Sequence, residues 1–272
     1  MKKILGAMRR CCEDFDMIAP GDRIAVGVSG GKDSLMLLYA LALYRRYMRI
    51  PFEIEALTLG IGLQEADYSG VEALCRDIGV PYTLRRTDIS DIIFNQRHEK
   101  NPCALCAKMR RGALNELAVQ RGCNKVALGH HRDDAIETLL LSLFYEGRLS
   151  TLQPVTYLSR SDLTVIRPML YISEKYITGV ARRLKLPIVE STCPANGYTK
   201  RQDMKELLDH ICRTIPHARQ YMLHALQDSD QYHLWPKPER KPLSPDAQPE
   251  STQPPQTPPQ SAAPTQSSSE QP

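Results

Sequence analysis

The sequence contains no apolar run close to the ~20 residues that a transmembrane helix needs, and no internal repeat is visible. Its first ten residues lack the long apolar stretch of a secretory signal peptide. These absences argue against a membrane protein, a secreted protein and a repeat architecture. We therefore expect a cytoplasmic protein whose eight cysteines stay reduced, so that any special cysteine spacing indicates metal or redox chemistry rather than disulfides.

Residues 236–272 have few apolar side chains to bury and are rich in Pro, Ser and Gln. Ordering such a segment costs chain entropy that no burial offsets. We expect one folded domain over residues 1–235, followed by a disordered tail over 236–272. A Pro-rich ligand for a partner protein is the alternative interpretation of the tail. The formal net charge of +4 is mildly basic, which is compatible with RNA as a partner without requiring it.

A glycine-rich turn connects an apolar segment, 23–28, to an apolar helical segment, 35–43. The turn consists of Ser29, Gly30, Gly31, Lys32, Asp33 and Ser34. A glycine turn between a strand and a helix aims backbone N–H groups at one point, where the helix N-terminus adds about half a positive charge. Phosphate is the expected ligand, with the lysine as a point charge and the serines as hydroxyl donors. The P-loop pattern of kinases is absent, because it needs Gly in place of Val26 and Ser or Thr in place of Asp33.

Apolar segments that fit strands alternate with segments that fit helices along the chain. Strands are predicted at 23–28, 52–59, 82–86, 125–128 and 164–166, and helices at 35–43, 66–78, 104–121, 134–145, 173–184 and within 200–228. This alternation predicts an α/β fold: a doubly wound, parallel, five-stranded sheet with helices on both faces. Ligands bind beyond the carboxyl ends of the strands in such sheets, so the glycine turn and residues 129–134 should face one crevice.

Residues 129–134 read Gly-His-His-Arg-Asp-Asp and follow the fourth predicted strand. Asp133 and Asp134 stand where a helix begins, a position at which aspartate is favoured as a cap, and at least one of them is expected to do only that. The alternative is that Asp133, together with Asp33, binds the Mg²⁺ ion of ATP, because Mg²⁺ takes one or two carboxylates plus phosphate oxygens. The two histidines fit either ordinary loop residues or members of the site.

Two cysteines, Cys103 and Cys106, stand three residues apart at the start of a predicted helix and fit one metal centre. Two ordinary buried cysteines are the alternative interpretation. Cys193 adds a third thiol, and three cysteines suit a [4Fe–4S] cluster with one open iron better than a structural zinc site, which needs four ligands. We treat the remaining cysteines as ordinary thiols and expect the first two of them to be exposed. They are Cys11, Cys12, Cys75, Cys123 and Cys212.

Taken together, the segments SGGKDS, PCALCAKMRRG and GHHRDD and the lone downstream cysteine resemble the tRNA 2-thiocytidine synthetase family of PP-loop ATP pyrophosphatases, from about residue 22 to about residue 212. The resemblance implies that ATP, with Mg²⁺, adenylates the carbonyl oxygen of a cytidine at tRNA position 32, releasing pyrophosphate. Sulfur then replaces the oxygen, which leaves with AMP.

The resemblance also implies a role for each matching residue. Cys103, Cys106 and Cys193 are the expected ligands of a [4Fe–4S] cluster. The glycine turn and Gly129 form the expected ATP site, in which Lys32, Asp33 and Asp133 are the candidate catalytic residues. A cysteine desulfurase system as sulfur donor and a homodimer are further expectations from the family.

Two arginines beside the cysteine pair, Arg110 and Arg111, are candidate ligands of tRNA phosphates. The sequence after Cys193 departs from that of better-known family members, so thiolation is a safer expectation than the choice of cytidine. Two alternatives remain open at this stage. One is ATP-dependent amidation or lysine ligation on tRNA, with zinc or no metal at the cysteines. The other is a non-catalytic protein that binds ATP or an iron–sulfur cluster and contacts a partner through its tail.

Overall fold

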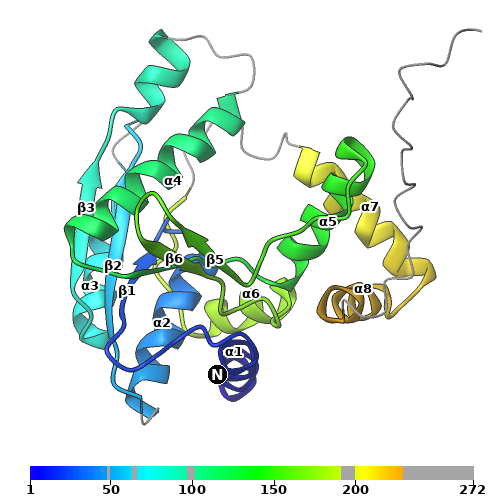
Figure 1. Ribbon diagram of the computed structural model, residues 1–272, viewed down its shortest axis with the longest axis horizontal. Coiled ribbons are helices and arrows are strands. Elements are labelled where there is room, and N and C mark those ends of the chain that lie inside the picture. The colour runs from blue at the N-terminus through cyan, green and yellow to red at the C-terminus, as the bar shows by residue number, and fades with distance from the viewer. Residues whose placement is uncertain (48–49, 63–65, 97–101, 191–199, 229–272) are drawn as a thin grey trace, which may run out of the picture. The chain divides into compact units, whose positions relative to one another are not determined.

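The computed structural model describes residues 1–47, 50–62, 66–96, 102–190 and 200–228 (Figure 1). The strands are β1 (Arg23–Gly27), β2 (Glu53–Gly60), β3 (Tyr82–Arg86), β4 (Lys125–Ala127), β5 (Val155–Leu158) and β6 (Leu163–Ile166). The helices are α1 (Lys2–Asp14), α2 (Lys32–Tyr47), α3 (Ser69–Ile78), the π-helical η1 (Asp91–Gln96), α4 (Pro102–Gln120), α5 (Arg132–Glu146), α6 (Glu174–Arg183), α7 (Lys200–Thr214) and α8 (Ala218–Gln227). The chain divides into two units, Met1–Gln231 and Tyr232–Pro272, and all described elements lie in the first.

The strands form one sheet in the order β3-β2-β1-β4-β6-β5. All neighbours pair in parallel except β5, which pairs antiparallel with β6. The five predicted strands are therefore present and parallel, and the predicted α/β fold class is confirmed. The predicted number of strands was wrong, because β5 adds a sixth. This short strand lies at the sheet edge and is only partly buried, so its sequence lacks the apolar run that marks the inner strands.

The direction of winding changes at β1, which lies between β2 and β4. The chain passes from β1 to β2 and β3 on one side and then returns to β4 on the other. Val26 of β1 lies opposite Ala127 of β4, so the two loops that follow these strands leave the sheet side by side. This position is the topological switch point, where ligands bind in sheets of this kind.

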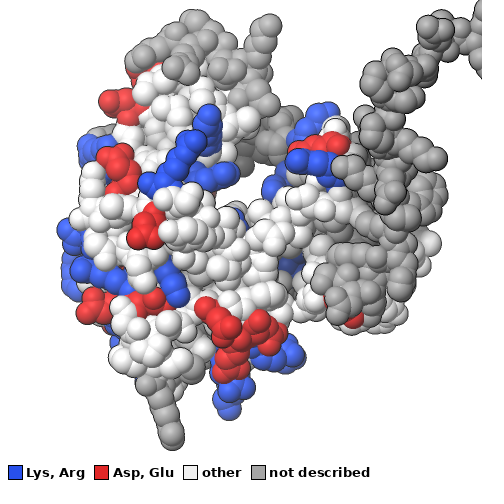
Figure 2. Space-filling view, viewed as in Figure 1, with Lys and Arg blue, Asp and Glu red and all other residues white. Residues whose placement is uncertain are grey.

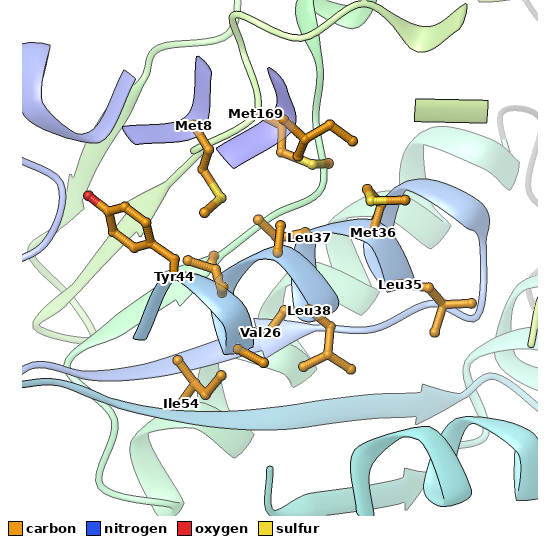
Figure 3. Close-up of a cluster of buried hydrophobic side chains, with 14 of the residues drawn as sticks. Met8, Val26, Leu35, Met36, Leu37, Leu38, Tyr44, Ile54 and Met169 are labelled. Atoms are coloured by element: carbon orange, nitrogen blue, oxygen red, sulfur yellow. The ribbon is translucent and has the colours of Figure 1, made fainter. Parts of the chain in front are cut away.

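Alternate residues of β1 serve the two faces of the sheet. Ile24 and Val26 join the large apolar core that includes α1, α2, α3 and α6, whereas Ala25 joins the cluster that α4 covers through Leu117 and Ala118. Helix α2 is apolar on all sides because it lies between the sheet and other helices. Figure 3 shows Leu38 of α2 facing Val26 and Ile54 of the strands, while Leu37 points away from them toward Met8 and Met169.

The N-terminal helix α1 was not predicted, and its presence corrects one expectation. Cys11 and Cys12 are buried, not exposed, because they share a helical face with Ile4 and Met8 that packs into the main core. Burial raises the pKa of the Cys11 thiol to about 12 and raises that of Cys12 as well. Both thiols are therefore poor nucleophiles and poor metal ligands at neutral pH.

Helices α5, α7 and α8 form a separate apolar cluster to one side of the sheet (Figure 1). Ile136 and Leu140 of α5 pack against Met204 and Leu208 of α7. The predicted terminal helices are thus confirmed as two, α7 and α8. Both pack on α5, the helix that begins at the loop after β4. Within the described ranges, no helix is both long and apolar enough to cross a bilayer. The predicted tail, 236–272, lies outside the described residues.

Candidate nucleotide and metal site

The glycine turn after β1 is a tight loop whose shape depends on Gly30. This residue has φ +86°, and a Cβ atom there would lie 2.8 Å from Cβ of Val189. The hydroxyl of Ser34 accepts a hydrogen bond from the N–H of Ser29 at 3.1 Å and donates to the carbonyl of Gly31 at 2.9 Å, which closes the loop. The first N–H groups of α2 have no acceptor within the helix and remain available to a ligand at this point.

Lys32 and Asp33 begin α2 and form the charged part of this loop. The Lys32 ammonium lies 2.8 Å from Oδ2 of Asp33. Oδ1 of Asp33 is buried and has no hydrogen-bond partner among the described residues. An unpartnered carboxylate oxygen is costly to bury, and hard cations such as Mg²⁺ prefer oxygen ligands of this kind. The donor set at Asp33 therefore fits the predicted magnesium ion of ATP.

Gly129 brings the second motif into contact with the first. A Cβ atom at this position would lie 3.0 Å from three backbone atoms, the carbonyl carbon and oxygen of Asp33 and the nitrogen of Ser34. Only glycine therefore lets the chain after β4 lie directly against the first turn of α2. This contact confirms that the two motifs lie together, while the crevice between them stays a prediction.

His131, rather than either aspartate, is the N-cap of α5. Its Nδ1 accepts a hydrogen bond from the N–H of Asp134 at 3.3 Å, and Oδ2 of Asp134 accepts one from the N–H of His131 at 2.9 Å. Asp134 thus completes a capping box, the purely structural role expected for one of the two aspartates. Because Nδ1 of His131 is an acceptor, its proton lies on Nε2, which is 3.8 Å from Oδ1 of Asp33.

Asp133 is buried, and both of its carboxylate oxygens are engaged by protein groups. Oδ2 accepts a hydrogen bond from the N–H of Glu174 at 2.8 Å, and Oδ1 lies 3.0 Å from Nε of Arg219. Asp133 therefore has a structural role in these contacts, and its predicted magnesium role stays a prediction. The contacts join the start of α5 to the start of α6 and to α8.

Glu174 is a member of the site that the sequence did not reveal. Its carboxylate lies 3.1 Å from Nζ of Lys32 and 2.7 Å from Nζ of Lys205 on α7. Burial alone would raise the pKa of Glu174, but hydrogen bonds and charge from Lys205 and Lys32 outweigh it and lower the pKa to about 2. Burial would likewise lower the pKa of Lys32, but Asp33 and Glu174 raise it. An acidic residue in the first turn of a helix is too common to have identified this contact from the sequence.

The cysteine pair lies on the first turn of α4, where Cys103 is exposed and Cys106 is half-buried. Residues three apart lie on the same side of a helix, so both thiols are accessible to one metal centre. Leu114, further along α4, would lie 2.9 Å from a Cβ at Gly27, the last residue of β1. Cys106 is eight residues before Leu114, about 12 Å along the helix axis. Helix α4 is therefore anchored at the end of the strand that precedes the glycine turn.

The third cysteine, Cys193, lies outside the described residues, but the chain that leads to it is placed. The N–H of Val189 donates to the carbonyl of Gly30 at 3.0 Å, so this segment runs against the glycine turn. Among the described residues, no three metal-binding side chains come together, so the cluster ligands stay a prediction.

The two candidate RNA-binding arginines, Arg110 and Arg111, are exposed on α4. Burial raises the pKa of Tyr68 while the nearby charge of Arg110 lowers it, and the ring of Tyr68 lies against Gly30. The charge of Arg111 acts on Arg167, whose pKa burial and this charge both lower. Figure 2 shows Lys and Arg side chains on both sides of a hollow between α4 and the helices α5 and α7.

Arg167 and His130 extend this basic region at the ends of β6 and β4. Nε of Arg167 donates to Nδ1 of His130 at 3.3 Å, and burial is the main reason that the pKa of His130 falls to about 4. The imidazole is therefore neutral at physiological pH. No carboxylate pairs with Arg167 in the described part of the chain, so its charge adds to that of Arg111. A lone arginine after a short strand gave no signal in the sequence.

Comparison with known proteins identifies the family. The model of the PP-loop domain family matches residues 6–209. The tRNA-cytidine(32) 2-sulfurtransferase of Citrifermentans bemidjiense is 39% identical over 86% of this chain and 93% of its own length, and that of Pelobacter propionicus is 41% identical over 86% and 88%. The chain belongs to the PP-loop family and, within it, to the tRNA-cytidine(32) 2-sulfurtransferases.

A solved structure supports the fold. The U34-tRNA thiolase NcsA from Methanococcus maripaludis, solved with its [4Fe-4S] cluster, matches 82% of this chain and 76% of its own with a TM-score of 0.66 and 22% identity. At that identity the match bears on the fold alone. The family match over residues 6–209 and the relatives at about 40% identity confirm both the PP-loop resemblance and the more specific family expectation.

Proposed function

We propose that the protein is an ATP-dependent tRNA sulfurtransferase that converts cytidine 32 of tRNA to 2-thiocytidine. Membership of the tRNA-cytidine(32) 2-sulfurtransferases supports this reaction over amidation, ligation and a non-catalytic role. The observation that carries the proposal is the contact between Val189 and Gly30, because it brings the chain leading to Cys193 against the nucleotide loop. Activation and sulfur delivery must occur at one base, so their residues must converge.

The glycine turn and the start of α2 bind the pyrophosphate end of ATP in this proposal. The backbone N–H groups of Gly31 and Lys32 face the phosphates, and the Lys32 ammonium neutralises the charge that develops on the leaving group. Ser34 shapes the loop through its hydroxyl, which donates to the carbonyl of Gly31, and Ser29 adds a hydroxyl donor. Gly129 keeps the chain after β4 close enough for the nucleotide to lie between the two motifs. Asp33 supplies the carboxylate for Mg²⁺.

The chemistry has two displacement steps that conserve atoms and need no oxidant. The O2 atom of the cytosine base attacks the α-phosphorus of ATP, and the bond to pyrophosphate breaks. A sulfur nucleophile then adds to C2, and the oxygen leaves with AMP, which is a far better leaving group than oxide. The protein contributes position and charge stabilisation, which dominate catalysis of phosphoryl-type transfers.

The [4Fe–4S] cluster would be held by Cys103, Cys106 and Cys193. The described donor set fits, because two accessible thiols lie on one turn of α4 with no histidine or carboxylate placed to complete a four-ligand zinc site in the described ranges. When bound, such a cluster with three protein ligands supplies an iron that can carry sulfur. A cysteine desulfurase system supplies that sulfur, and the enzyme works in the cytoplasm, where tRNA is found.

The tRNA docks at the hollow in Figure 2, on the side formed by α4, where Arg110 and Arg111 are exposed. Arg110, Arg111 and Arg167 bind its backbone phosphates, and the target base leaves its stack to reach the glycine turn. Loop nucleotides of tRNA are suitable substrates because little pairing must be broken. We also propose a homodimer, on the basis of family resemblance.

Deletion of the gene tests this function directly. Nucleosides from total tRNA of the deletion strain are compared with those of the parent by mass spectrometry. We expect 2-thiocytidine to disappear, all other thiolated nucleosides to remain, and a plasmid copy of the gene to restore the loss. Unchanged 2-thiocytidine with loss of a different modified nucleoside would contradict the proposed substrate.

A further inference from the structure

Glu174 places a permanent negative charge inside a site for polyphosphate. Its carboxylate contacts Lys32, the lysine of the glycine turn, and Lys205 of α7 at the same time. A carboxylate in such a place repels the ligand that the site is built to bind. Its presence therefore calls for a physical role.

The backbone fixes Glu174 in this position. It is the first residue of α6, and its N–H donates to Oδ2 of Asp133 at 2.8 Å. Asp133 is in turn held by Arg219 of α8 at 3.0 Å. The carboxylate is thus presented to Lys32 from a helix start whose backbone is tied to Asp133, and Lys205 contacts it independently of Lys32.

We propose that Glu174 is a positioning residue that competes with pyrophosphate for the Lys32 ammonium. When the loop is empty, Glu174 and Asp33 hold the Lys32 ammonium at the edge of the phosphate site. When ATP binds, its phosphates attract the Lys32 ammonium away from Glu174. After adenylation, the Lys32 ammonium pairs with Glu174 again, and this pairing favours release of pyrophosphate. This inference rests on the proposed function, because pyrophosphate is the leaving group of that reaction.

Lys205 should raise the affinity for pyrophosphate, whereas Glu174 should lower it. Lys205 shares the Glu174 carboxylate with Lys32 and therefore weakens the hold of Glu174 on Lys32. Its own charge also attracts an anion in the loop. Loss of Glu174 and loss of Lys205 should consequently have opposite effects on pyrophosphate affinity, whereas a purely structural tie between α6 and α7 would make both losses act in the same direction.

The test is calorimetric titration of the full-length protein with magnesium pyrophosphate, which needs no turnover. We expect Glu174→Gln to bind pyrophosphate about tenfold more tightly, since one nearby repulsive charge is removed, and Lys205→Met to bind it several-fold more weakly. Glu174→Asp keeps the negative charge, so its affinity for pyrophosphate should lie closer to that of the wild type than to that of Glu174→Gln. In turnover, Glu174→Gln should lower both kcat and the KM for ATP, because pyrophosphate leaves slowly.

Two exposed neighbours serve as matched controls for the loss of one charge. Glu206→Gln on α7 removes a negative charge from a side chain that contacts Gln202, and Lys175→Met on α6 removes a positive charge. Both should leave pyrophosphate affinity within about twofold of the wild type, since exposed charges are screened by salt.

The outcomes separate this inference from the proposed function. Wild-type protein that binds pyrophosphate while Glu174→Gln binds it equally or more weakly would overturn the competing role of Glu174 alone. Equal weakening in Glu174→Gln and Lys205→Met, with a lower melting temperature in both, would assign Glu174 to structure only. Wild-type protein that binds no pyrophosphate would contradict the nucleotide site itself.

Discussion

The middle and the first turn of helix α2 differ in burial and in polarity. Its middle, Leu35 to Leu38, is fully buried in the main core and carries no polar group (Figure 3). Its first turn carries Lys32 and Asp33, and one buried oxygen of Asp33 has no partner among the described residues. The difference shows how the site is supported, since the buried middle fixes a helix whose first turn can then hold groups that a stable core would exclude.

The cysteines also divide into buried residues of the core and accessible residues near the site. Burial raises the pKa of Cys11 to about 12 and that of Cys75 to about 11, so these thiols stay protonated and serve as packing. Cys103 and Cys106, at the start of α4, remain accessible. Metal centres require thiolates, so burial separates Cys11, Cys12, Cys75 and Cys123 from the candidate ligands, whereas Cys212 is half-buried like Cys106.

The largest expected effect comes from Cys103→Ala. This change should remove the broad absorbance near 400 nm of the anaerobically purified protein and abolish thiolation. The unfolding free energy of the cluster-free protein should stay within about 0.5 kcal/mol of that of the cluster-free wild type, because the side chain is exposed. Spectra and nucleoside analysis measure the first two effects, and denaturant unfolding measures the third. Cys75→Ala, the buried control, should keep both the absorbance and thiolation.

Leu37→Ala should have the next largest effect, in the other region of α2. Removing a fully buried leucine creates a cavity and should lower the free energy of unfolding by about 2–5 kcal/mol. The folded fraction should keep wild-type kcat/KM at a temperature where it remains native. A loss of activity per folded molecule would show that the core and the first turn are not separable.

Gly129→Ala should disturb the contact between the two motifs. Its Cβ would meet backbone atoms of Asp33 and Ser34, so the glycine turn must shift, and kcat/KM for ATP should fall about 10- to 100-fold. Gly79→Ala is the control, because φ is +67° there and nothing lies within 4 Å. That change should cost about 1 kcal/mol of stability and leave the kinetics with ATP unchanged.

Arg111→Gln should have the smallest of these effects. Loss of one phosphate contact should raise the KM for tRNA about three- to tenfold, reduce the salt dependence of binding by about one unit of slope, and leave the KM for ATP unchanged. Arg183→Gln, an exposed arginine at the end of α6, is the control. A matching change in the control would mean that general charge, not this surface, determines tRNA affinity.

The sequence predicted the parts of the protein that carry strong local signals. The glycine turn, the GHHRDD segment and the five parallel strands were found because glycines, apolar runs and capping residues act locally. Helix α1 was not predicted, although its buried residues Ile4, Met8, Cys11 and Cys12 recur at helical spacing. Strand β5 was missed because an edge strand needs little burial.

The residues missed in the site share a different cause. Glu174, Lys205 and Arg167 are ordinary charged residues on separate elements, and they meet near the loops only after the chain folds. Their sequence neighbours give no signal of that meeting. The motif that contains Asp133 suggested an ion ligand, and it gave no sign that the same carboxylate contacts Glu174 of α6 and Arg219 of α8.

The most direct test of the account is reconstitution of the reaction with purified protein. The anaerobically prepared enzyme is incubated with ATP, Mg²⁺, inorganic sulfide and an unmodified tRNA transcript, and the nucleosides, AMP and pyrophosphate are quantified. We expect 2-thiocytidine at position 32 with one AMP and one pyrophosphate per sulfur, and no thiolation with Cys103→Ala. Equal 2-thiocytidine from the wild type and Cys103→Ala would contradict the assignment of the accessible cysteines to sulfur transfer.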